Sequence, residues 1–212
     1  MSVPEGVTVV DHVLLRRLLT ILRDRDTPHG VFRQTLDDAA RIVAYEAMRS
    51  LRGTEHELQT PLEPAAGLKL ADPIVIVAIL RAGLGMVDGF LRLVPEARVG
   101  HLGMYRDEEA LRPVGYYENV PSGVEEAEVF VVDPMLATGG SATQAIARLK
   151  RAGARRIHFV CLVAAPEGVK ALREAHPEVP IVTAALDRQL DENGYIRPGL
   201  GDAGDRIFGT DR

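Results

Sequence analysis

The segment from residue 129 to 141 has the order of residue types best suited to binding a ligand: Val-Phe-Val-Val-Asp-Pro-Met-Leu-Ala-Thr-Gly-Gly-Ser. Its apolar, mostly β-branched start predicts a buried parallel strand that ends at Asp133. Gly139 and Gly140 allow the backbone to turn tightly and to approach a ligand closely. A helical pattern follows, and amides at a helix N-terminus attract anions because the helix dipole places positive charge there. The segment therefore predicts a phosphate site next to an acid.

The side chains of this loop add hydrogen-bonding groups to the predicted phosphate site. Asp133 follows the strand at the edge where open α/β sheets bind ligands, so it can accept hydrogen bonds from sugar hydroxyls. We expect Thr138 and Ser141 to cap the helix and to offer their hydroxyls. The loop is not a P-loop, because that motif needs a lysine directly before its final Ser or Thr and glycine precedes Ser141 here.

A second segment that can recognise a ligand lies near the end of the chain, where residues 195 to 210 read Tyr-Ile-Arg-Pro-Gly-Leu-Gly-Asp-Ala-Gly-Asp-Arg-Ile-Phe-Gly-Thr. Its glycines and Pro198 are interpreted as ruling out a regular helix or a central strand. Such a segment exposes backbone donors and acceptors, which can read the edge of a flat heterocycle. Its apolar residues argue against a disordered tail.

Residues 74 to 89 form another strand-loop-helix pattern, in which an apolar run is followed by glycines at 83, 85 and 89. The first two glycines fit the dinucleotide fingerprint, but the third comes one place late. An acid about twenty residues on, Asp107, keeps a nicotinamide-dinucleotide site open as an alternative. Arg81 directly after the strand suits a phosphate ligand, because its guanidinium stays charged and pairs with two oxygens at once.

Composition narrows the class of protein. The chain has 212 residues, one cysteine and a formal net charge of −5, which suits one α/β domain and argues against non-specific nucleic-acid binding. Its longest apolar run is too short to cross a bilayer. The single Cys161 cannot form an internal disulfide, and the N-terminus does not have the layout of a signal peptide. We therefore expect a cytoplasmic protein with no nucleic-acid partner and no membrane partner.

Strands and helices alternate along the chain, which predicts an α/β fold with a mainly parallel sheet flanked by helices. The helices are expected at 11–23 with Asp11 as the cap, at 29–51, in a short segment that follows Gly85 and ends at about Leu93, and at 141–152 and 167–175. The strands are expected at 73–80, 97–105, 116–119, 128–132, 157–164 and 180–185, with one short strand within 54–68. No composition break divides the chain. We expect a single domain, 1–212, with a core from about 70–190 and a small hood formed by about 1–68 and 191–212.

These motifs resemble those of the type I phosphoribosyltransferases. The form Val-Asp-Pro-Met-Leu-Ala-Thr-Gly-Gly-Ser is similar to the loop with which the uracil phosphoribosyltransferase family binds 5-phosphoribosyl 1-diphosphate (PRPP). Many relatives carry two adjacent acids here, whereas Pro134 follows Asp133 in this chain, as in the uracil branch. The C-terminal segment resembles the uracil-binding loop of the same family. The resemblance covers nearly the whole chain, including the stretch from Leu18 to Thr27.

The resemblance implies an activity, namely transfer of the phosphoribosyl group from PRPP to N1 of uracil to give UMP and pyrophosphate. It implies PRPP contacts from Arg81, Arg106, Asp133, Pro134, Met135, Leu136, Ala137, Thr138, Gly139, Gly140, Ser141 and Asp202. It implies uracil contacts from Ile196, Gly201, Asp202 and Ala203. The catalytic residues would be Arg81, Arg106, Asp133 and Asp202, with Arg106 opening a hinged loop that closes over PRPP.

The resemblance also implies a cofactor and an assembly. Mg²⁺ would be held through PRPP, with Asp202 as a candidate ligand. The family implies a homodimer or a higher homo-oligomer. GTP activates some relatives, and no motif in this sequence decides whether it acts here.

Three alternatives stay open on the sequence. An RNA-binding pyrimidine regulator with the same fold would need a basic face, and the acidic composition weighs against it. Support for an NAD-dependent oxidoreductase would come from the glycines that follow residue 80, which nearly match the dinucleotide fingerprint. A phosphoribosyltransferase for a purine base would keep the PRPP loop and differ in the C-terminal segment.

Overall fold

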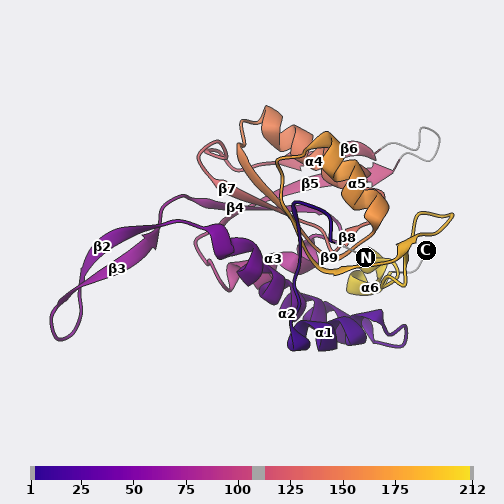
Figure 1. Cartoon of the computed structure of the whole chain (residues 1–212), viewed down its shortest axis with the longest axis horizontal. Helices are drawn as coiled ribbons and strands as arrows, with labels where there is room; N and C mark the ends of the chain where they lie inside the picture. The colour runs from indigo at the N-terminus through magenta and orange to yellow at the C-terminus, as the bar shows by residue number, and fades with distance from the viewer. Residues whose placement is uncertain (1–2, 107–112, 211–212) are drawn as a thin grey trace.

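A central sheet lies between two layers of helices, and a long hairpin projects from one end of the molecule (Figure 1). The structure is a computed structural model that describes residues 3–106 and 113–210. No helix in these two ranges is both long enough and apolar enough to span a membrane.

The elements follow the expected alternation of strand and helix. The helices are α1 (Val13–Arg23), α2 (His29–Ala47), α3 (Leu84–Leu91), α4 (Gly140–Arg151), α5 (Pro166–Ala175) and α6 (Ala203–Phe208), with a 3₁₀ turn at Met48–Ser50. The strands are β1 (Val7–Val9), β2 (Gly53–Gln59), β3 (Pro64–Leu70), β4 (Ile74–Leu80), β5 (Arg98–Arg106), β6 (Pro113–Asn119), β7 (Glu128–Val132), β8 (Met135–Leu136), β9 (Arg156–Ala164), β10 (Ile181–Leu186), β11 (Gln189–Leu190) and β12 (Ile196–Arg197).

The main sheet has the strand order β1-β10-β9-β7-β4-β5-β6, with β8 added to β9. Its pairs are parallel except for β5 and β6, which are antiparallel. Both faces of the sheet are covered, so the central strands β4, β7 and β9 are apolar along almost their whole length. The expected fold class, a mainly parallel sheet flanked by helices, is confirmed.

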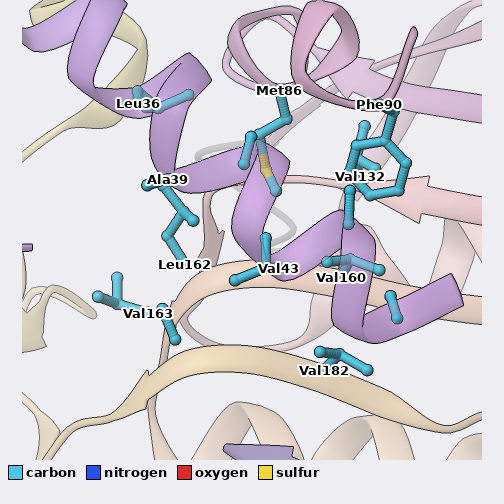
Figure 2. Packing of buried hydrophobic residues seen from close by; sticks show 14 of the residues in the cluster. Leu36, Ala39, Val43, Met86, Phe90, Val132, Val160, Leu162, Val163 and Val182 are labelled. Atoms are coloured by element: carbon cyan, nitrogen blue, oxygen red, sulfur yellow. The ribbon is translucent and has the colours of Figure 1, made fainter. Parts of the chain in front are cut away.

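Two apolar cores fill the spaces between the sheet and its helices. One core joins α1, α2 and α3 to the sheet, and the other joins α4 and α5 to the opposite face. Figure 2 shows α2 crossing the first face, where Leu36, Ala39 and Val43 point towards side chains of β9 and of α3. Packing on both faces holds the ends of the strands in fixed positions, which is what a binding site at those ends requires.

The start of α1 differs from the prediction. The N-cap is His12, whose Nδ1 accepts a hydrogen bond of 3.2 Å from the amide of Leu14. Asp11, the expected cap, instead forms an exposed ion pair with Arg16. The expectation was wrong because Asp11 lies one residue too early to reach the first turn, where His12 supplies the acceptor.

The extended region after α2 contains two strands where one was expected. β2 and β3 pair with each other as an antiparallel hairpin that forms its own two-stranded sheet. All residues of β2 are exposed, and Figure 1 shows the hairpin standing away from the rest of the molecule. The residue range assigned to the hood thus includes an arm that lies far from the C-terminal segment.

The C-terminal segment contains a short helix, although its glycines were interpreted as excluding one. Asp202 caps the N-terminus of α6 by accepting a hydrogen bond of 3.1 Å from the amide of Asp205, and Gly209 ends the helix in the left-handed conformation. These two caps stabilise a helix that residue propensity alone does not predict. The helix packs against α2.

Candidate active site

The candidate site lies where the chain order reverses within the sheet. β4 is flanked by β5 on one side and by β7 on the other. The carboxyl ends of β4 and β7 therefore lie side by side, and open α/β sheets bind ligands at such a point. Arg81 follows the last residue of β4, and Asp133 follows the last residue of β7, so the two charged residues singled out in the sequence are brought to the same edge.

The loop at residues 133–141 is held against β9 and α5. The amides of Leu162 and Val163 donate to the carbonyl of Pro134 at 3.0 and 3.1 Å. Met135 and Leu136 form β8, which continues beside β9. Ala137 packs closely on Gly168 of α5, where an added Cβ would lie 2.3 Å from the Ala137 carbonyl oxygen. The loop is therefore a fixed part of the core edge, and it presents its last residues at the start of α4.

The N-terminus of α4 has no side-chain cap, so the expectation that Thr138 and Ser141 would cap it was wrong. Its N-cap residue is Gly139, in the left-handed conformation with φ at 81°. Thr138 is exposed and Ser141 is half-buried, so both hydroxyls stay near the loop surface. A glycine cap leaves the first-turn amides and the helix dipole directed at the space in front of α4, which is the arrangement that binds phosphate groups.

Among the carboxylates of the described residues, Asp133 has the pKa most strongly shifted by its surroundings. Burial among the strand ends raises its pKa from 3.8 to about 7, with the amide of Met135 lowering and the charge of Asp202 raising that pKa. The Met135 amide lies 3.3 Å from Oδ1, so this one hydrogen bond does not compensate for lost solvation. A shift of this size at a ligand-binding edge is typical of a functional carboxylate.

The side chain of Arg81 contacts two residues of α6. One of its Nη atoms donates to Asp205 at 2.9 Å, and its guanidinium lies 5.8 Å from the centre of the Phe208 ring. About half of the side chain is exposed, with a relative accessibility of 51%. An arginine held from one side and exposed on the other can still pair with a bound phosphate.

The predicted base-contacting residues lie together at the C-terminal segment. Ile196 and Ala203 are buried, Asp202 is half-buried and Gly201 is exposed. Asp202 is close enough to Asp133 for its charge to raise the pKa of that carboxyl. The structure therefore brings Arg81, Asp133 and Asp202 to one place, between the loop at 133–141 and the segment at 196–203.

The side chain of Arg106 cannot be placed relative to these residues. Its backbone ends β5, and its side chain, like residues 107–112, lies outside the described part of the structure. Asp107, which kept the dinucleotide alternative open, belongs to the same undescribed range.

The glycines after β4 serve close packing of protein against protein. A Cβ on Gly83 would lie 2.5 Å from the Val132 carbonyl oxygen, and one on Gly89 would lie 2.9 Å from the Asp37 carbonyl oxygen. The first contact joins the turn to β7 and the second joins α3 to α2. These roles account for the near-fingerprint without a dinucleotide.

Sequence reasoning missed Asp205, which holds Arg81, and Asp187, which lies directly after β10. Asp187 could have been predicted from the sequence, because it is an acid directly after an apolar strand, which is the same signal that marked Asp133. Asp187 is buried and pairs with Arg23 of α1.

The mainly parallel sheet flanked by helices is the fold of the type I phosphoribosyltransferases. Adenine phosphoribosyltransferase from Trypanosoma brucei superposes with a TM-score of 0.57 at 14% identity, covering 91% of this chain and 90% of that one. At this identity the likeness shows a shared fold. A structure of the AQ2163 protein from Aquifex aeolicus is much more similar, with a TM-score of 0.92, 36% identity and coverage of 96% and 98%.

Sequence comparison defines the family. Residues 9–210 match the family model for uracil phosphoribosyltransferase. The uracil phosphoribosyltransferase of Salinibacter ruber is 66% identical over 206 residues, which cover 97% of this chain and 98% of that protein. The chain belongs to the uracil phosphoribosyltransferase family.

Proposed function

We propose that this chain transfers the phosphoribosyl group of PRPP to N1 of uracil, which yields UMP and pyrophosphate. The observation that carries the proposal is the convergence of Arg81, Asp133 and Asp202 at the carboxyl edge of the sheet. An anion-binding helix N-terminus lies at one side of these residues, and a glycine-rich segment with exposed backbone lies at the other. Membership of the family supports the same reaction.

The loop at 133–141 supplies the anchor for the 5′-phosphate. The uncapped amides at the start of α4 and the hydroxyls of Thr138 and Ser141 can donate to phosphate oxygens. Pro134 and Met135 to Ala137 hold the loop against β9 and α5, so these donors are in place before the ligand arrives. Fixing the phosphate and the ribose in this way lowers the barrier by orientation.

Asp133 is proposed to accept hydrogen bonds from the ribose hydroxyls. Its pKa of about 7 reflects missing solvation in the free protein, and hydrogen bonds from a ligand favour the ionised carboxylate. Binding of PRPP should therefore lower this pKa and release a proton from the fraction of Asp133 that is protonated at neutral pH.

Arg81 and Arg106 are proposed to bind the pyrophosphate group. In the reaction the bond from ribose C1 to the pyrophosphate oxygen breaks while a bond from uracil N1 to C1 forms, and N1 loses its proton. Negative charge grows on the leaving group, and a guanidinium stabilises such charge. Asp202 is a candidate acceptor of the N1 proton, because its Oδ1 accepts the amide of Asp205 and the carboxylate has a second oxygen.

The residues present fit a magnesium ion that arrives with the substrate. Within the described ranges no group of three His, Cys, Asp or Glu could hold a metal ion. Mg²⁺ in phosphate-transfer sites is commonly held by one or two carboxylates together with substrate oxygens. Asp133 and Asp202 repel each other in the free protein, so a cation between PRPP and Asp202 would relieve that repulsion. When bound, the ion would neutralise charge on the pyrophosphate.

The segment at 196–203 is proposed to recognise uracil through its backbone. Gly201 is exposed with φ at 78°, and it has no side chain that would block access to its peptide groups. Ile196 and Ala203 are almost fully buried, so we infer that they contact the base through their peptide groups. Alternating donors and acceptors on the uracil edge match alternating backbone groups.

We also propose that the protein forms a homodimer or a larger homo-oligomer. The β2–β3 hairpin projects from the body and exposes Leu58, Leu62, Leu68 and Leu70. An isolated two-stranded hairpin with exposed leucines is marginally stable unless a partner surface covers it. Light scattering on the wild type and on Leu68→Asp tests this, and a monomeric wild type would overturn it. A cytoplasmic location stays a prediction from the sequence, and a GTP effector stays an implication of the family resemblance.

The test of the proposed function is pyrophosphate release from PRPP and Mg²⁺ in the presence of uracil, cytosine, hypoxanthine, orotate or no base. Release with uracil alone is the expected result. Release with a different base would keep the assignment of the PRPP loop and reject the assignment of residues 196–203 to uracil. Folded protein that releases none with any base would refute the proposal.

A further inference from the structure

A buried ion pair outside the proposed substrate contacts touches the backbone of the base-recognising segment. Arg23 of α1 donates to both carboxylate oxygens of Asp187, with its two Nη atoms at 2.8 and 2.6 Å from Oδ2 and Oδ1. The side chain of Asp187 is only 5% exposed, and that of Arg23 is 25% exposed. Such a two-pronged pair has one well-defined geometry, so it can position whatever it also contacts.

Both members of this pair bind Gly199. The amide of Gly199 donates to Oδ2 of Asp187 at 2.9 Å, and its carbonyl accepts a hydrogen bond of 2.8 Å from Arg23. Gly199 is buried with φ at 62°, and a Cβ there would lie 2.1 Å from the Ile196 carbonyl oxygen. The peptide groups on both sides of Gly199 are therefore fixed two residues before Gly201.

A second arginine fixes the next peptide group. Arg206 of α6 donates to the Leu200 carbonyl at 2.7 Å and also to the carbonyls of Leu22 and Asp24. Its guanidinium lies 4.2 Å from the centre of the Phe32 ring. Leu22 and Asp24 are at the C-terminus of α1, where the helix dipole attracts a cation. Arg206 thus connects the segment to the same end of the same helix as Arg23.

We propose that Arg23, Asp187 and Arg206 are positioning residues that fix the backbone of residues 199–201 for recognition of the base. This proposal rests on the proposed function, because it deepens the assignment of the segment at 196–203 to uracil. Recognition through peptide groups has no side chain to adapt, so it depends on peptide groups that are ordered before binding. The three residues act through the backbone and need no contact with substrate.

The proposal has a kinetic signature that a general structural role would not have. If loss of a contact leaves the segment in its binding-competent form about a tenth of the time, the apparent affinity for uracil falls about tenfold. The loop at 133–141 makes its contacts with β9 and α5. Binding of PRPP alone should therefore weaken less than the KM for uracil rises, since that loop keeps its competent form and Asp202 alone of the proposed PRPP contacts lies in the perturbed segment.

The test compares Arg23→Lys, Asp187→Asn and Arg206→Lys with the wild type. Arg23→Lys keeps the positive charge but cannot donate to both carboxylate oxygens at once. Asp187→Asn places an amide donor opposite the guanidinium donors of Arg23. Arg16→Met is the matched control, because it removes an exposed ion pair with Asp11 from the same helix. The measurements are kcat, the KM for uracil, the Kd for Mg²⁺-PRPP, the melting temperature and amide hydrogen exchange at residues 199–203.

The expected result is a rise of about tenfold or more in the KM for uracil for each of the three variants, with faster exchange at 199–203 and a smaller loss of PRPP binding. Arg16→Met should match the wild type. An active wild type whose variants keep its KM for uracil and its exchange rates would overturn the positioning role. Equal losses of PRPP and uracil binding would also overturn it. A wild type that does not turn over uracil would refute the proposed function itself. If Asp187→Asn does not fold, the two lysine variants decide.

Discussion

Asp133 should make the stability of this protein depend on pH in a direction opposite to that of most acidic residues. Its pKa is raised from 3.8 to about 7 in the folded protein, mainly by burial. Above pH 7 the folded state must hold an ionised, poorly solvated carboxylate, whereas the unfolded state solvates it fully. Replacement by asparagine removes that cost, so Asp133→Asn should be more stable than the wild type.

The size of the effect follows from the shift. Each pKa unit corresponds to about 1.4 kcal/mol, so the full cost above pH 7 is of the order of 4 kcal/mol. The cost is absent below the unfolded pKa, grows between 3.8 and 7 and is complete above the folded pKa. The advantage of Asp133→Asn should therefore be about 2 kcal/mol at pH 5 and about 4 kcal/mol at pH 8.

Urea denaturation at pH 5 and pH 8, at one protein concentration, measures this advantage. Asp191→Asn is a suitable control, because the pKa of Asp191 is lowered, chiefly by the amide of Tyr195. The pKa of Asp191 lies below 5 in both the folded and the unfolded state. The effect of Asp191→Asn on the free energy of unfolding should therefore be the same at pH 5 and pH 8. The reasoning would be refuted if the difference in unfolding free energy between Asp133→Asn and the wild type were also the same at pH 5 and pH 8.

Three further predictions concern the surroundings of the site. Asp205→Asn weakens the hold on Arg81, so the KM for PRPP should rise severalfold in steady-state kinetics while the KM for uracil changes less. Gly139→Ala places a Cβ in the left-handed conformation, 2.8 Å from the Gly168 carbonyl oxygen. Gly139→Ala should lower the free energy of unfolding, measured by urea titration, by about 1–3 kcal/mol. It should also weaken PRPP binding, measured by calorimetry. Unchanged PRPP affinity would argue against the proposed role of the loop at 133–141. Cys161 is fully buried with its pKa raised to about 12 by burial, so it should resist thiol reagents until the protein unfolds; rapid labelling of native protein would contradict this.

The strand-loop-helix unit at the PRPP loop could be predicted almost to the residue, whereas the hairpin could not. β7 was placed at its observed bounds because a short apolar run with both faces buried ends at a glycine-rich turn. β2, by contrast, reads Gly-Thr-Glu-His-Glu-Leu-Gln and has no buried face. Since the alternation of apolar and polar residues reports burial, a hairpin with one fully exposed strand leaves little signal in the sequence.

The contacts that position the site were beyond sequence reasoning because they join distant parts of the chain. Arg81 and Asp205 are 124 residues apart, and Arg23 and Asp187 are 164 apart. Nothing local in α1 indicates that Arg23 turns inward while Arg16 faces solvent. The N-cap of α4 was misassigned for a related reason: a positive φ at Gly139 depends on how closely the loop packs on α5, which a motif does not reveal.

The most direct test of the central claim is identification of the product formed from PRPP, Mg²⁺ and isotopically labelled uracil. The account predicts labelled UMP, with ribose attached at N1, in amounts equal to the pyrophosphate released, and strongly reduced turnover by folded Asp133→Ala. Pyrophosphate released without labelled UMP would contradict it, because PRPP would then be hydrolysed at a site that does not recognise uracil.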